Sequence, residues 1–560
     1  MHRDKRLLAA SRATLLLPLI GLAACGGGGS DTPGGPDFSM QSASEACTSV
    51  GTLSVEAAAI GLPTQGATIT STKLVAASGS QGEYCEVRGS IQPMDATAPP
   101  IKLQANLPSQ WNGKMMQFGG GGFDGTVVTG LNAAPNSPSS IRTPLARGYV
   151  TFGSDSGHTG GIGFSTNDAA FGLNDEALAN YGGDAIKKVH DAVAAIVHAR
   201  YGDRAVKTYF VGGSKGGQEA LAAAQRWPSD YDGVVSYYPA WSYTAAFSAA
   251  NRLTVASYQP GAYINAAKGT MLFNAVVSAC DALDGVADGI VSSPAACHFD
   301  PATVRCAGGS DTGDTCLSDA QIAMVQQIES PSALAFPVHN GIQGYPGFPV
   351  LSGAQLQGPF LAFFGSSPTP STQPAFGAQS FLNSLSDGFV KYFVTRDATY
   401  DALQYRAQDA VDTAKGTSHQ ARVQQISASL DASDDISAFA RRGGKLLLLH
   451  GTADAIVSPR GSIAYHQRVQ DQLGAEATRA FMRFFMIPGF GHGYAAPFAA
   501  TVDSVGALED WVERGIAPAG LTTADAATAR SRPLCEYGSY PKYNGSGNVN
   551  AAASFTCTPN

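Results

Sequence analysis

The chain has 560 residues, of which 44% are hydrophobic and 14% are charged, and its formal net charge is −8. This composition is typical of a globular protein with a large apolar core. Because the sequence has no long basic run, nucleic acid is not expected as a partner, and the small acidic excess does not select a substrate.

The N-terminus is predicted to be an export signal rather than part of the fold. A positively charged start (residues 3–6) precedes an apolar stretch (residues 15–24) that is too short to span a bilayer. The stretch ends in Leu-Ala-Ala-Cys, which resembles a bacterial lipobox. That resemblance implies removal of a signal peptide, residues 1–24, and lipidation of Cys25. An ordinary signal peptide with an incidental cysteine is the alternative.

A tether rich in glycine and proline follows, at residues 25–45. Position 26 is glycine and not the aspartate that favours retention at the inner membrane. The prediction is therefore an outer-membrane lipoprotein, or a periplasmic or extracellular protein, whose only membrane contact is the N-terminal lipid. No later segment of the sequence is long and apolar enough to span a membrane.

Eight cysteines remain besides Cys25, and an even set in an exported chain predicts disulfides. Their connectivity does not follow from the sequence. Pairing of nearest neighbours would close four local loops and is the arrangement that we expect. The pairs would be Cys47 with Cys85, Cys280 with Cys297, Cys306 with Cys316, and Cys535 with Cys557.

The first core segment, residues 46–240, alternates strand and helix patterns. Such an order predicts a parallel sheet that is covered on both faces. The strands are expected at residues 101–105, 114–118, 149–152, 208–211 and 232–237, and the helices at 184–201 and 219–227.

The pattern is lost between residues 241 and 440, a stretch too long for a loop, and we expect an inserted lid domain there. Strand patterns return at residues 445–449 and 484–487, and a helix is expected at 505–512. These belong to a second core segment, residues 441–560, whose tail carries two cysteines.

A nucleophile motif lies directly after the strand at residues 208–211. Residues 212–216 read Gly-Gly-Ser-Lys-Gly, which matches G-x-S-x-G, and a helical pattern follows. The serine needs a tight, strained turn, and small residues around it supply the room. We therefore expect Ser214 to be a nucleophile; a glycine-rich turn with an incidental serine is the alternative.

A serine hydroxyl needs a base, and in α/β-hydrolases the acid and the histidine follow the serine in the chain. Asp454 follows the strand at residues 445–449. His492 stands in a glycine-rich loop after the strand at residues 484–487. The fold predicted is an α/β-hydrolase core with a large inserted lid, and its catalytic triad is Ser214, Asp454 and His492.

Three further residues compete for these roles. His450 lies at a strand end, where histidine more often packs or bonds to the backbone. Asp503 comes after His492 and therefore breaks the order. His158 follows a strand and could border the site, although a structural role is favoured.

Acyl transfer also needs donors for the oxyanion of the tetrahedral intermediate. One is expected to be the backbone N–H of Lys215, the residue after the nucleophile. The other is expected from the glycine run at residues 119–122, which resembles an HGGG-type motif in its position. We favour Gly119, the first glycine after the strand.

Several segments together resemble the tannase and feruloyl esterase family, which also includes mono(2-hydroxyethyl) terephthalate hydrolases. The resemblance runs from about residue 47 to the C-terminus and implies hydrolysis of esters, often of aromatic acids, beneath a lid. The segments that carry it are residues 111–114, 118–120, 155–158, 209–217, 280–290, 511–515 and 532–535.

An acidic segment within the expected lid has chemistry of its own. Asp281, Asp284 and Asp288 alternate with glycines, so their carboxylates can wrap around a hard cation. Calcium takes six to eight oxygen ligands, and the resemblance implies that the carbonyls of Val286 and Ile290 assist. We expect a structural calcium ion that braces the lid; a solvated acidic turn is the alternative.

One departure from the family is visible in the sequence. Many members carry cysteines just before the serine and just after the histidine, which form a disulfide across the triad. This chain has Gly213 and Gly493 at those positions. How His492 is held in place is therefore not explained by the resemblance, and the substrate preference transfers less directly.

The function predicted is a secreted serine carboxylic ester hydrolase that acts on aromatic acid esters, feruloyl, galloyl or related, through an acyl-serine intermediate. The alternatives are an acyltransferase using the same triad and an inactive surface-binding lipoprotein.

No arginine of the lid can be assigned to a substrate carboxylate, so a terephthalate monoester is not favoured. Phe360, Phe363 and Phe364 could line an acyl pocket, although clustered phenylalanines are more often core. The oligomeric state cannot be read from the sequence.

Overall fold

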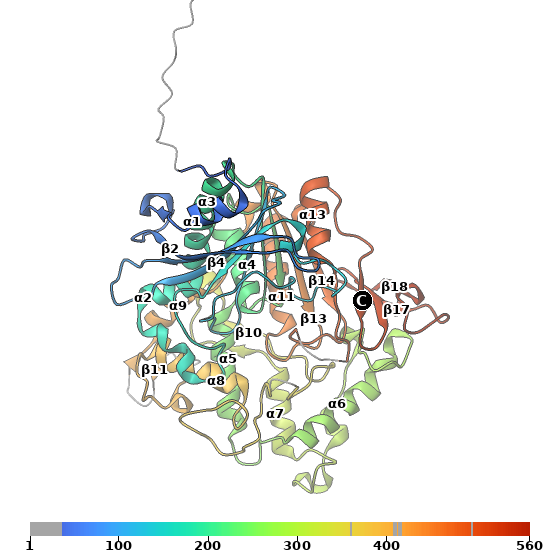
Figure 1. Cartoon of the computed structure of the whole chain (residues 1–560). Coiled ribbons are helices and arrows are strands. Elements are labelled where there is room, and N and C mark those ends of the chain that lie inside the picture. Colours follow the sequence, from blue (N-terminus) through green and yellow to red (C-terminus); the bar gives the residue numbers. More distant parts are fainter. Residues whose placement is uncertain (1–35, 359–360, 407–410, 413–416, 494–496) are drawn as a thin grey trace, which may run out of the picture. The chain divides into compact units, whose positions relative to one another are not determined.

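A ten-stranded sheet runs through the protein, and its second half is parallel (Figure 1). Strands β1 to β4 and β6 pair antiparallel with their neighbours, whereas β6, β5, β7, β8, β13 and β14 pair in parallel. In spatial order the strands are β1 (Ser54–Val55), β2 (Ala67–Val75), β3 (Tyr84–Ile91), β4 (Ile101–Pro108), β6 (Val150–Ser154), β5 (Lys114–Phe118), β7 (Lys207–Gly213), β8 (Gly233–Tyr237), β13 (Lys445–Gly451) and β14 (Met482–Ile487).

The structure is a computed structural model that describes residues 36–358, 361–406, 411–412, 417–493 and 497–560. The expected signal peptide, Cys25 and the first half of the tether lie outside the described residues. Phe360 lies outside them as well.

The parallel strands are apolar on both faces, which explains their unbroken hydrophobic runs. Along β13, Leu446 and Leu448 pack into one core cluster, while Leu447 and Leu449 pack into another on the opposite face. The period-two alternation of side chains thus places these four leucines in two different clusters. This double burial is what the sequence pattern predicted for a covered sheet.

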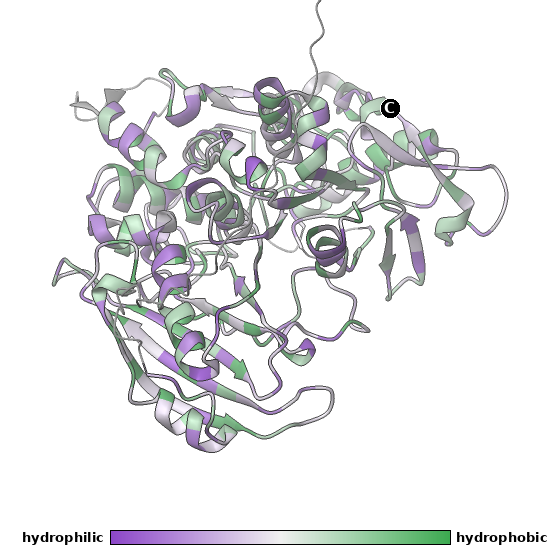
Figure 2. Cartoon of the chain, turned by 90° about the horizontal axis from the view of Figure 1, so that it is seen from above, coloured by the Kyte–Doolittle hydropathy of each residue, from purple (hydrophilic) through white to green (hydrophobic). Residues whose placement is uncertain are grey.

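Helices cover both faces of this sheet. Helix α4 (Lys215–Arg226) packs on β7 and β8, α13 (Ser504–Arg514) packs on β8 and β13, and α3 (Ala185–Tyr201) packs on β4 and β6. In Figure 2 the helices carry both hydrophilic and hydrophobic residues, as amphipathic surface helices do. The remaining helices of the core are α1 (Ala43–Val50), α2 (Asp175–Ala179), α11 (Pro459–Leu473) and α12 (Ala475–Phe481).

The residues between β8 and β13 form an insertion, because these two strands are direct neighbours in the sheet. Hydrophobic periodicity did not predict its helices. Helix α5 (Tyr243–Ser257) is buried along most of its length and therefore has no clear polar face. The other elements are α6 (Ala266–Cys280), α7 (Asp319–Glu329), α8 (Phe381–Gly388), α9 (Gln420–Leu430), α10 (Ser437–Arg441) and four two-residue strands, β9 (Ser332–Ala333), β10 (Gly344–Tyr345), β11 (Val411–Asp412) and β12 (Thr417–Ser418).

The C-terminal tail folds into two hairpins after α13. Strand β15 (Thr522–Asp525) pairs with β16 (Arg530–Pro533), and β17 (Ser539–Tyr543) pairs with β18 (Phe555–Pro559). The tail rejoins the sheet through an antiparallel bridge between Phe485 of β14 and Glu536.

Nearest-neighbour pairing of the cysteines is confirmed. Four disulfides join Cys47 to Cys85, Cys280 to Cys297, Cys306 to Cys316, and Cys535 to Cys557. Among the described residues, every helix is too short or too polar to serve as a membrane span.

Candidate active site

Ser214 occupies a strained turn between β7 and α4. Its φ is 62° and its ψ is −120°, a backbone conformation that side-chain-bearing residues rarely adopt. Its N–H donates to the carbonyl of Tyr237 at 3.0 Å, which fixes the turn to β8. A β-carbon on Gly216 would lie 2.7 Å from the carbonyl oxygen of Gly120, so the close approach of this turn to the glycine run requires glycine.

The three residues expected to form the triad lie in one hydrogen-bonded row. His492 Nε2 lies 2.9 Å from Ser214 Oγ, and His492 Nδ1 lies 2.7 Å from Asp454 Oδ2. Asp454 follows β13 and His492 follows β14, so both loops leave the carboxyl end of the parallel strands. Such a row can take the proton of the serine hydroxyl and hold the imidazolium that results.

Asp454 is positioned as a permanent anion. Its side chain is fully buried, and its Oδ1 accepts the N–H groups of Ile456 at 2.8 Å and Val457 at 2.9 Å. Burial raises the pKa of Asp454, but the attraction of His492 and the hydrogen bonds from His450 and His492 outweigh it, so the net pKa is lowered.

The three competing residues, His450, Asp503 and His158, do not belong to the row from Asp454 to Ser214. His450 is fully buried, with Nδ1 2.8 Å from Ser462 Oγ and Nε2 3.3 Å from Asp454 Oδ2, so it lies behind the acid. Asp503 caps the start of α13 through the N–H of Gly506. His158 is buried behind the glycine run, where its Nε2 lies 2.7 Å from the carbonyl oxygen of Phe123. Burial lowers the pKa of His158 to about 4.

The structure corrects the expectation that Gly119 supplies an oxyanion donor. The N–H of Gly119 donates to the carbonyl of Val211 at 2.9 Å, which continues the pairing of β5 with β7. The N–H of Gly120 likewise donates a hydrogen bond, to Glu219 Oε2 at 2.9 Å. Within the described residues, the N–H groups of Lys215 and Gly121 have no acceptor, and both residues line the cavity beside Ser214.

A buried charge cluster that the sequence did not reveal supports these donors. Lys215 Nζ lies 2.9 Å from Glu219 Oε1, 3.8 Å from Asp124 Oδ2 and 4.4 Å from the ring centroid of Tyr181. Burial, with the charge of Glu219, raises the pKa of Asp124 well above its ordinary value and so favours its neutral form. The ammonium of Lys215 accordingly lies closer to the carboxylate of Glu219 than to Asp124.

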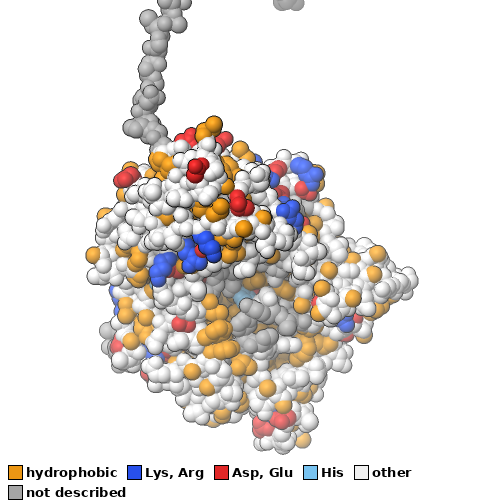
Figure 3. Space-filling model, in the orientation of Figure 1, with side chains coloured by type: hydrophobic (Ala, Val, Ile, Leu, Met, Phe, Trp, Pro, Cys, Tyr) orange, Lys and Arg blue, Asp and Glu red, His pale blue; other side chains and the backbone are white. Residues whose placement is uncertain are grey.

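Ser214 opens into a cavity of about 320 Å³ whose walls are mostly apolar. The face of the molecule seen in Figure 3 has a hollow with a histidine side chain inside it and hydrophobic side chains around it. Among the described residues, the only side chains of the lining with an ionisable nitrogen are His492 and the paired Lys215. The insertion contributes Tyr243, Ala246, Phe247, Ala250, Phe348, Phe381, Leu382 and Leu385.

Two of the three phenylalanines singled out from the sequence, Phe363 and Phe364, lie outside the cavity lining. Phe363 and Phe364 are 4% and 2% exposed and belong to the core cluster, not to the cavity lining. Their spacing could not distinguish core from pocket, because both environments favour large apolar side chains.

The residues expected to bind calcium share one loop after α6. Asp281 Oδ1 accepts the N–H groups of Asp288 at 3.1 Å and Ile290 at 3.2 Å. Asp284 Oδ1 accepts the N–H of Val286 at 3.0 Å. These contacts are made by the N–H groups of Val286 and Ile290 and not by their carbonyl oxygens.

The donor set of this loop fits a hard cation. Asp288 Oδ2 pairs with the buried guanidinium of Arg532, from β16. Asp284 is fully buried, and its Oδ2 has no hydrogen-bond partner among the described residues. Burial, with the charges of Asp288 and Asp281, raises the pKa of Asp284 to about 6. A buried carboxylate oxygen without a donor, beside two further carboxylates, is the kind of ligand that calcium accepts.

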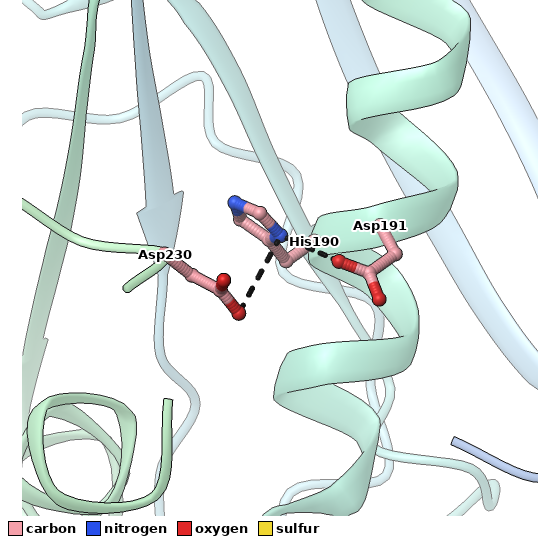
Figure 4. A group of neighbouring side chains, drawn as sticks. All are labelled: His190, Asp191 and Asp230. Carbon is pink, nitrogen blue, oxygen red and sulfur yellow. Dashed lines mark hydrogen bonds and ion pairs between the residues drawn. The ribbon is translucent and has the colours of Figure 1, made fainter. Parts of the chain in front are cut away.

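A second acidic group could also hold a metal ion. His190 Nδ1 lies 2.9 Å from Asp191 Oδ1 and 4.0 Å from Asp230 Oδ2 (Figure 4). The ammonium of Lys187 pairs with the same two carboxylates, at 2.9 Å and 2.8 Å. This lysine offsets one of the two negative charges without a metal. The group was missed in the sequence because Asp230 comes from a different segment than the other two.

Comparison with known proteins identifies the family of the chain. The model of the family described as tannase and feruloyl esterase matches residues 85–558. An uncharacterized esterase of Agrobacterium fabrum is 38% identical over 538 residues, covering 92% of this chain and 94% of that protein. Mono(2-hydroxyethyl) terephthalate hydrolase of Piscinibacter sakaiensis is 32% identical over 522 residues, covering 85% of each chain.

Solved structures show the same fold. Feruloyl esterase B from Aspergillus oryzae superposes with a TM-score of 0.72 at 24% identity, covering 92% of this chain and all of that one. Tannin acyl hydrolase from Aspergillus niger gives a TM-score of 0.67 at 21% identity, with 92% and 96% covered. The predicted α/β-hydrolase fold is thereby confirmed. With a family match over residues 85–558 and relatives above 30% identity across most of its length, the chain belongs to the tannase and feruloyl esterase family of carboxylic ester hydrolases.

Proposed function

We propose that the protein hydrolyses carboxylic esters through an acyl intermediate on Ser214. The observation that carries this proposal is the row from Asp454 through His492 to Ser214, with contacts of 2.7 Å and 2.9 Å, at the wall of an apolar cavity. The family supplies the reaction class, and this row supplies the nucleophile, the base and the residue that orients the base.

In the proposed reaction His492 Nε2 takes the proton of Ser214 Oγ as this oxygen attacks the acyl carbon. The N–H groups of Lys215 and Gly121 are the donors we assign to the oxyanion, because neither has another acceptor among the described residues. The imidazolium then protonates the oxygen of the leaving alcohol as the ester C–O bond breaks and the carbonyl re-forms, which leaves the acyl group on Ser214. A water molecule, deprotonated by His492, releases the acid and restores the serine.

We further propose that the substrates are uncharged esters of aromatic acids. Tyr243, Phe247, Phe348 and Phe381 supply aromatic faces to the cavity, and a flat ring can pack against them. Relatives of this chain include probable feruloyl esterases and mono(2-hydroxyethyl) terephthalate hydrolase. A substrate carboxylate has no cationic partner among the described lining residues except Lys215, whose charge is already paired with Glu219. Burying such a charge unpaired would be costly.

The decisive experiment compares the wild type with Ser214→Ala on a matched pair of substrates. We expect methyl ferulate or dimethyl terephthalate to be hydrolysed and the corresponding terephthalate monoester, which differs by one carboxylate, to be hydrolysed far more slowly. Ser214→Ala should lower kcat by several orders of magnitude. Full activity of that variant would refute the mechanism, and equal kcat/KM on the matched pair would refute the substrate class. Product analysis with an added alcohol separates hydrolysis from acyl transfer.

A structural calcium ion is proposed for the loop at residues 281–290. The carboxylates of Asp281, Asp284 and Asp288 would hold it, and it would supply no chemistry to the acyl transfer. Its effect would be to neutralise adjacent negative charges and to tie the loop to Arg532 in the tail through Asp288.

Export and lipidation at Cys25 are proposed from the sequence and are supported by the disulfides. Four disulfides form and persist in an oxidising compartment. Metabolic labelling with palmitate should mark the wild type and not Cys25→Ser, and only the wild type should partition with membranes. Equal labelling of both proteins would rule out this anchor.

A further inference from the structure

Tyr238 packs directly against the imidazole of His492. Its ring centroid lies 4.6 Å from that of His492, at an interplanar angle of 54°. The residue comes immediately after β8, and its N–H donates to the carbonyl of Leu449 in β13 at 2.7 Å. Its φ is +36°, an unfavourable value for a residue with a bulky side chain, so the fold holds this ring in place at a conformational cost.

The same ring fills the space beside the neighbours of both Ser214 and His492. A β-carbon on Gly213 would lie 2.8 Å from Cε2 and 2.9 Å from the hydroxyl oxygen of Tyr238. A β-carbon on Gly493 would lie 2.8 Å from that hydroxyl oxygen. One side chain therefore occupies the space toward which both glycines would project a side chain.

His492 needs such lateral support. Its loop contains glycines at positions 489, 491 and 493, and two of them, Gly489 and Gly493, have positive φ. The bond to Asp454 fixes Nδ1 but leaves the imidazole free to tilt about that contact. The ring of Tyr238 lies tilted against the imidazole, where it can oppose this tilt. Tyr238 is itself packed near Tyr237, His450 and Phe490, at centroid distances of 5.8, 6.3 and 6.4 Å.

We propose that Tyr238 is a positioning residue that holds His492 toward Ser214 by aromatic packing. Its ring fills the space beside Gly213 and Gly493. The proposal rests on the proposed function for its effect on turnover, but not for its effect on the imidazole. Many members of the family have cysteines at the positions of Gly213 and Gly493, which a disulfide can link. In this chain the packed ring of Tyr238 takes that place, and its packing requires glycine at both positions.

The test compares Tyr238→Phe and Tyr238→Leu with a matched control, Tyr465→Leu. Tyr465 is fully buried, whereas Tyr238 is 7% exposed, and it packs on Trp241 in a different core cluster from Tyr238. Tyr238→Phe keeps the ring and should retain kcat within about threefold. Tyr238→Leu should lower kcat by about 10- to 100-fold, as expected for a base displaced by a fraction of an ångström to about 1 Å. Tyr465→Leu should lower Tm at least as much while kcat stays near the wild-type value.

A second readout needs no substrate. The proton of His492 Nδ1, hydrogen-bonded to Asp454, gives a far-downfield signal in proton NMR spectra, which is assigned by its loss in Asp454→Asn. We expect this signal to persist in Tyr238→Phe and Tyr465→Leu and to broaden or vanish in Tyr238→Leu. A wild-type kcat and an unchanged signal in Tyr238→Leu would overturn the proposal, and so would equal losses in the Phe and Leu variants. If the wild type hydrolyses no ester, the proposed function fails, while the signal still decides the role of Tyr238.

Discussion

The carboxylate of Glu219 accepts the backbone N–H of Gly120 at 2.9 Å. Its other oxygen pairs with the buried ammonium of Lys215 at 2.9 Å. Glu219, a residue of α4, thereby fixes the glycine run. Its ion-pair partner, Lys215, is also a residue whose backbone N–H we assign to the oxyanion. The geometry of both assigned donors, Lys215 and Gly121, therefore depends on one buried ion pair.

Replacement of Glu219 should separate its two tasks. Glu219→Ala removes both contacts and leaves Lys215 buried without its partner, so we expect the free energy of unfolding to fall by about 3–5 kcal/mol and kcat to fall as well. Glu219→Gln keeps an acceptor for Gly120 and removes the charge that raises the pKa of Asp124, the second carboxyl beside Lys215. This variant should lose much less of both.

Asp124→Asn is the control for this series. Burial and the charge of Glu219 raise the pKa of Asp124 and favour its neutral form, which a neutral amide of the same shape imitates. Chemical denaturation and kcat should both stay near the wild type. A loss as large as that of Glu219→Ala would show that Asp124, and not Glu219, is the charged partner of Lys215.

Asp454→Asn tests the role of the acid. An asparagine amide donates to His492 Nδ1, which favours the tautomer in which Nε2 carries the proton and cannot accept one from Ser214. We expect kcat to fall by about four orders of magnitude with little change in KM. A fall of about tenfold or less would mean that another group orients the imidazole, and His450 is the nearest alternative.

The three residues of the proposed triad could be picked out from the sequence because each carries a local signal. Ser214 lies in G-x-S-x-G after a strand, and Asp454 and His492 follow the apolar runs that became β13 and β14. The bounds of β5 matched residue for residue, because Gly113 before the strand and the glycine run after it mark both ends.

What the sequence could not reveal depends on contacts between distant segments. Gly119 is the first glycine of its run, but whether its N–H is free depends on Val211 in the adjacent strand. The packing of Tyr238 on His492 joins residues from two different loops and has no periodic signature. The helices of the insertion escaped detection because α5 is buried on most sides, which removes the hydrophobic contrast that marks a helix.

Asp431 should make stability depend on pH near neutrality. Its side chain is 1% exposed, and its Oδ1 accepts the N–H of Thr244 at 2.8 Å in the first turn of α5, the helix that lines the cavity. Burial raises the pKa of Asp431 from 3.8 to about 7. Between these two values the folded protein keeps a proton that the unfolded chain has released, so stability falls as pH rises, by at most about 1.4 kcal/mol per pH unit.

Asp431→Asn removes this titration and keeps a neutral group of the same shape. We expect the Tm of the variant relative to the wild type to increase from about pH 5 to about pH 8, with most of the change below about pH 7. The measurement is thermal unfolding in buffers of constant ionic strength. A difference in Tm that is the same at both pH values would contradict the assigned shift.

Calcium should stabilise the fold through the loop at residues 281–290 and not through the group around His190. A ligand that binds only the folded state raises Tm in proportion to the logarithm of its concentration above its Kd, so added calcium should raise Tm and a chelator should lower it. Asp284→Asn replaces the buried carboxylate whose Oδ2 has no partner among the described residues and should abolish this dependence. Asp230→Asn, the matched control, removes a carboxylate that already has Lys187 as an ion-pair partner and should leave the dependence intact. If the opposite pattern were observed, the ion would belong to His190, Asp191 and Asp230; if Tm ignored calcium in every variant, the loop would be closed by its own hydrogen bonds and Arg532 alone.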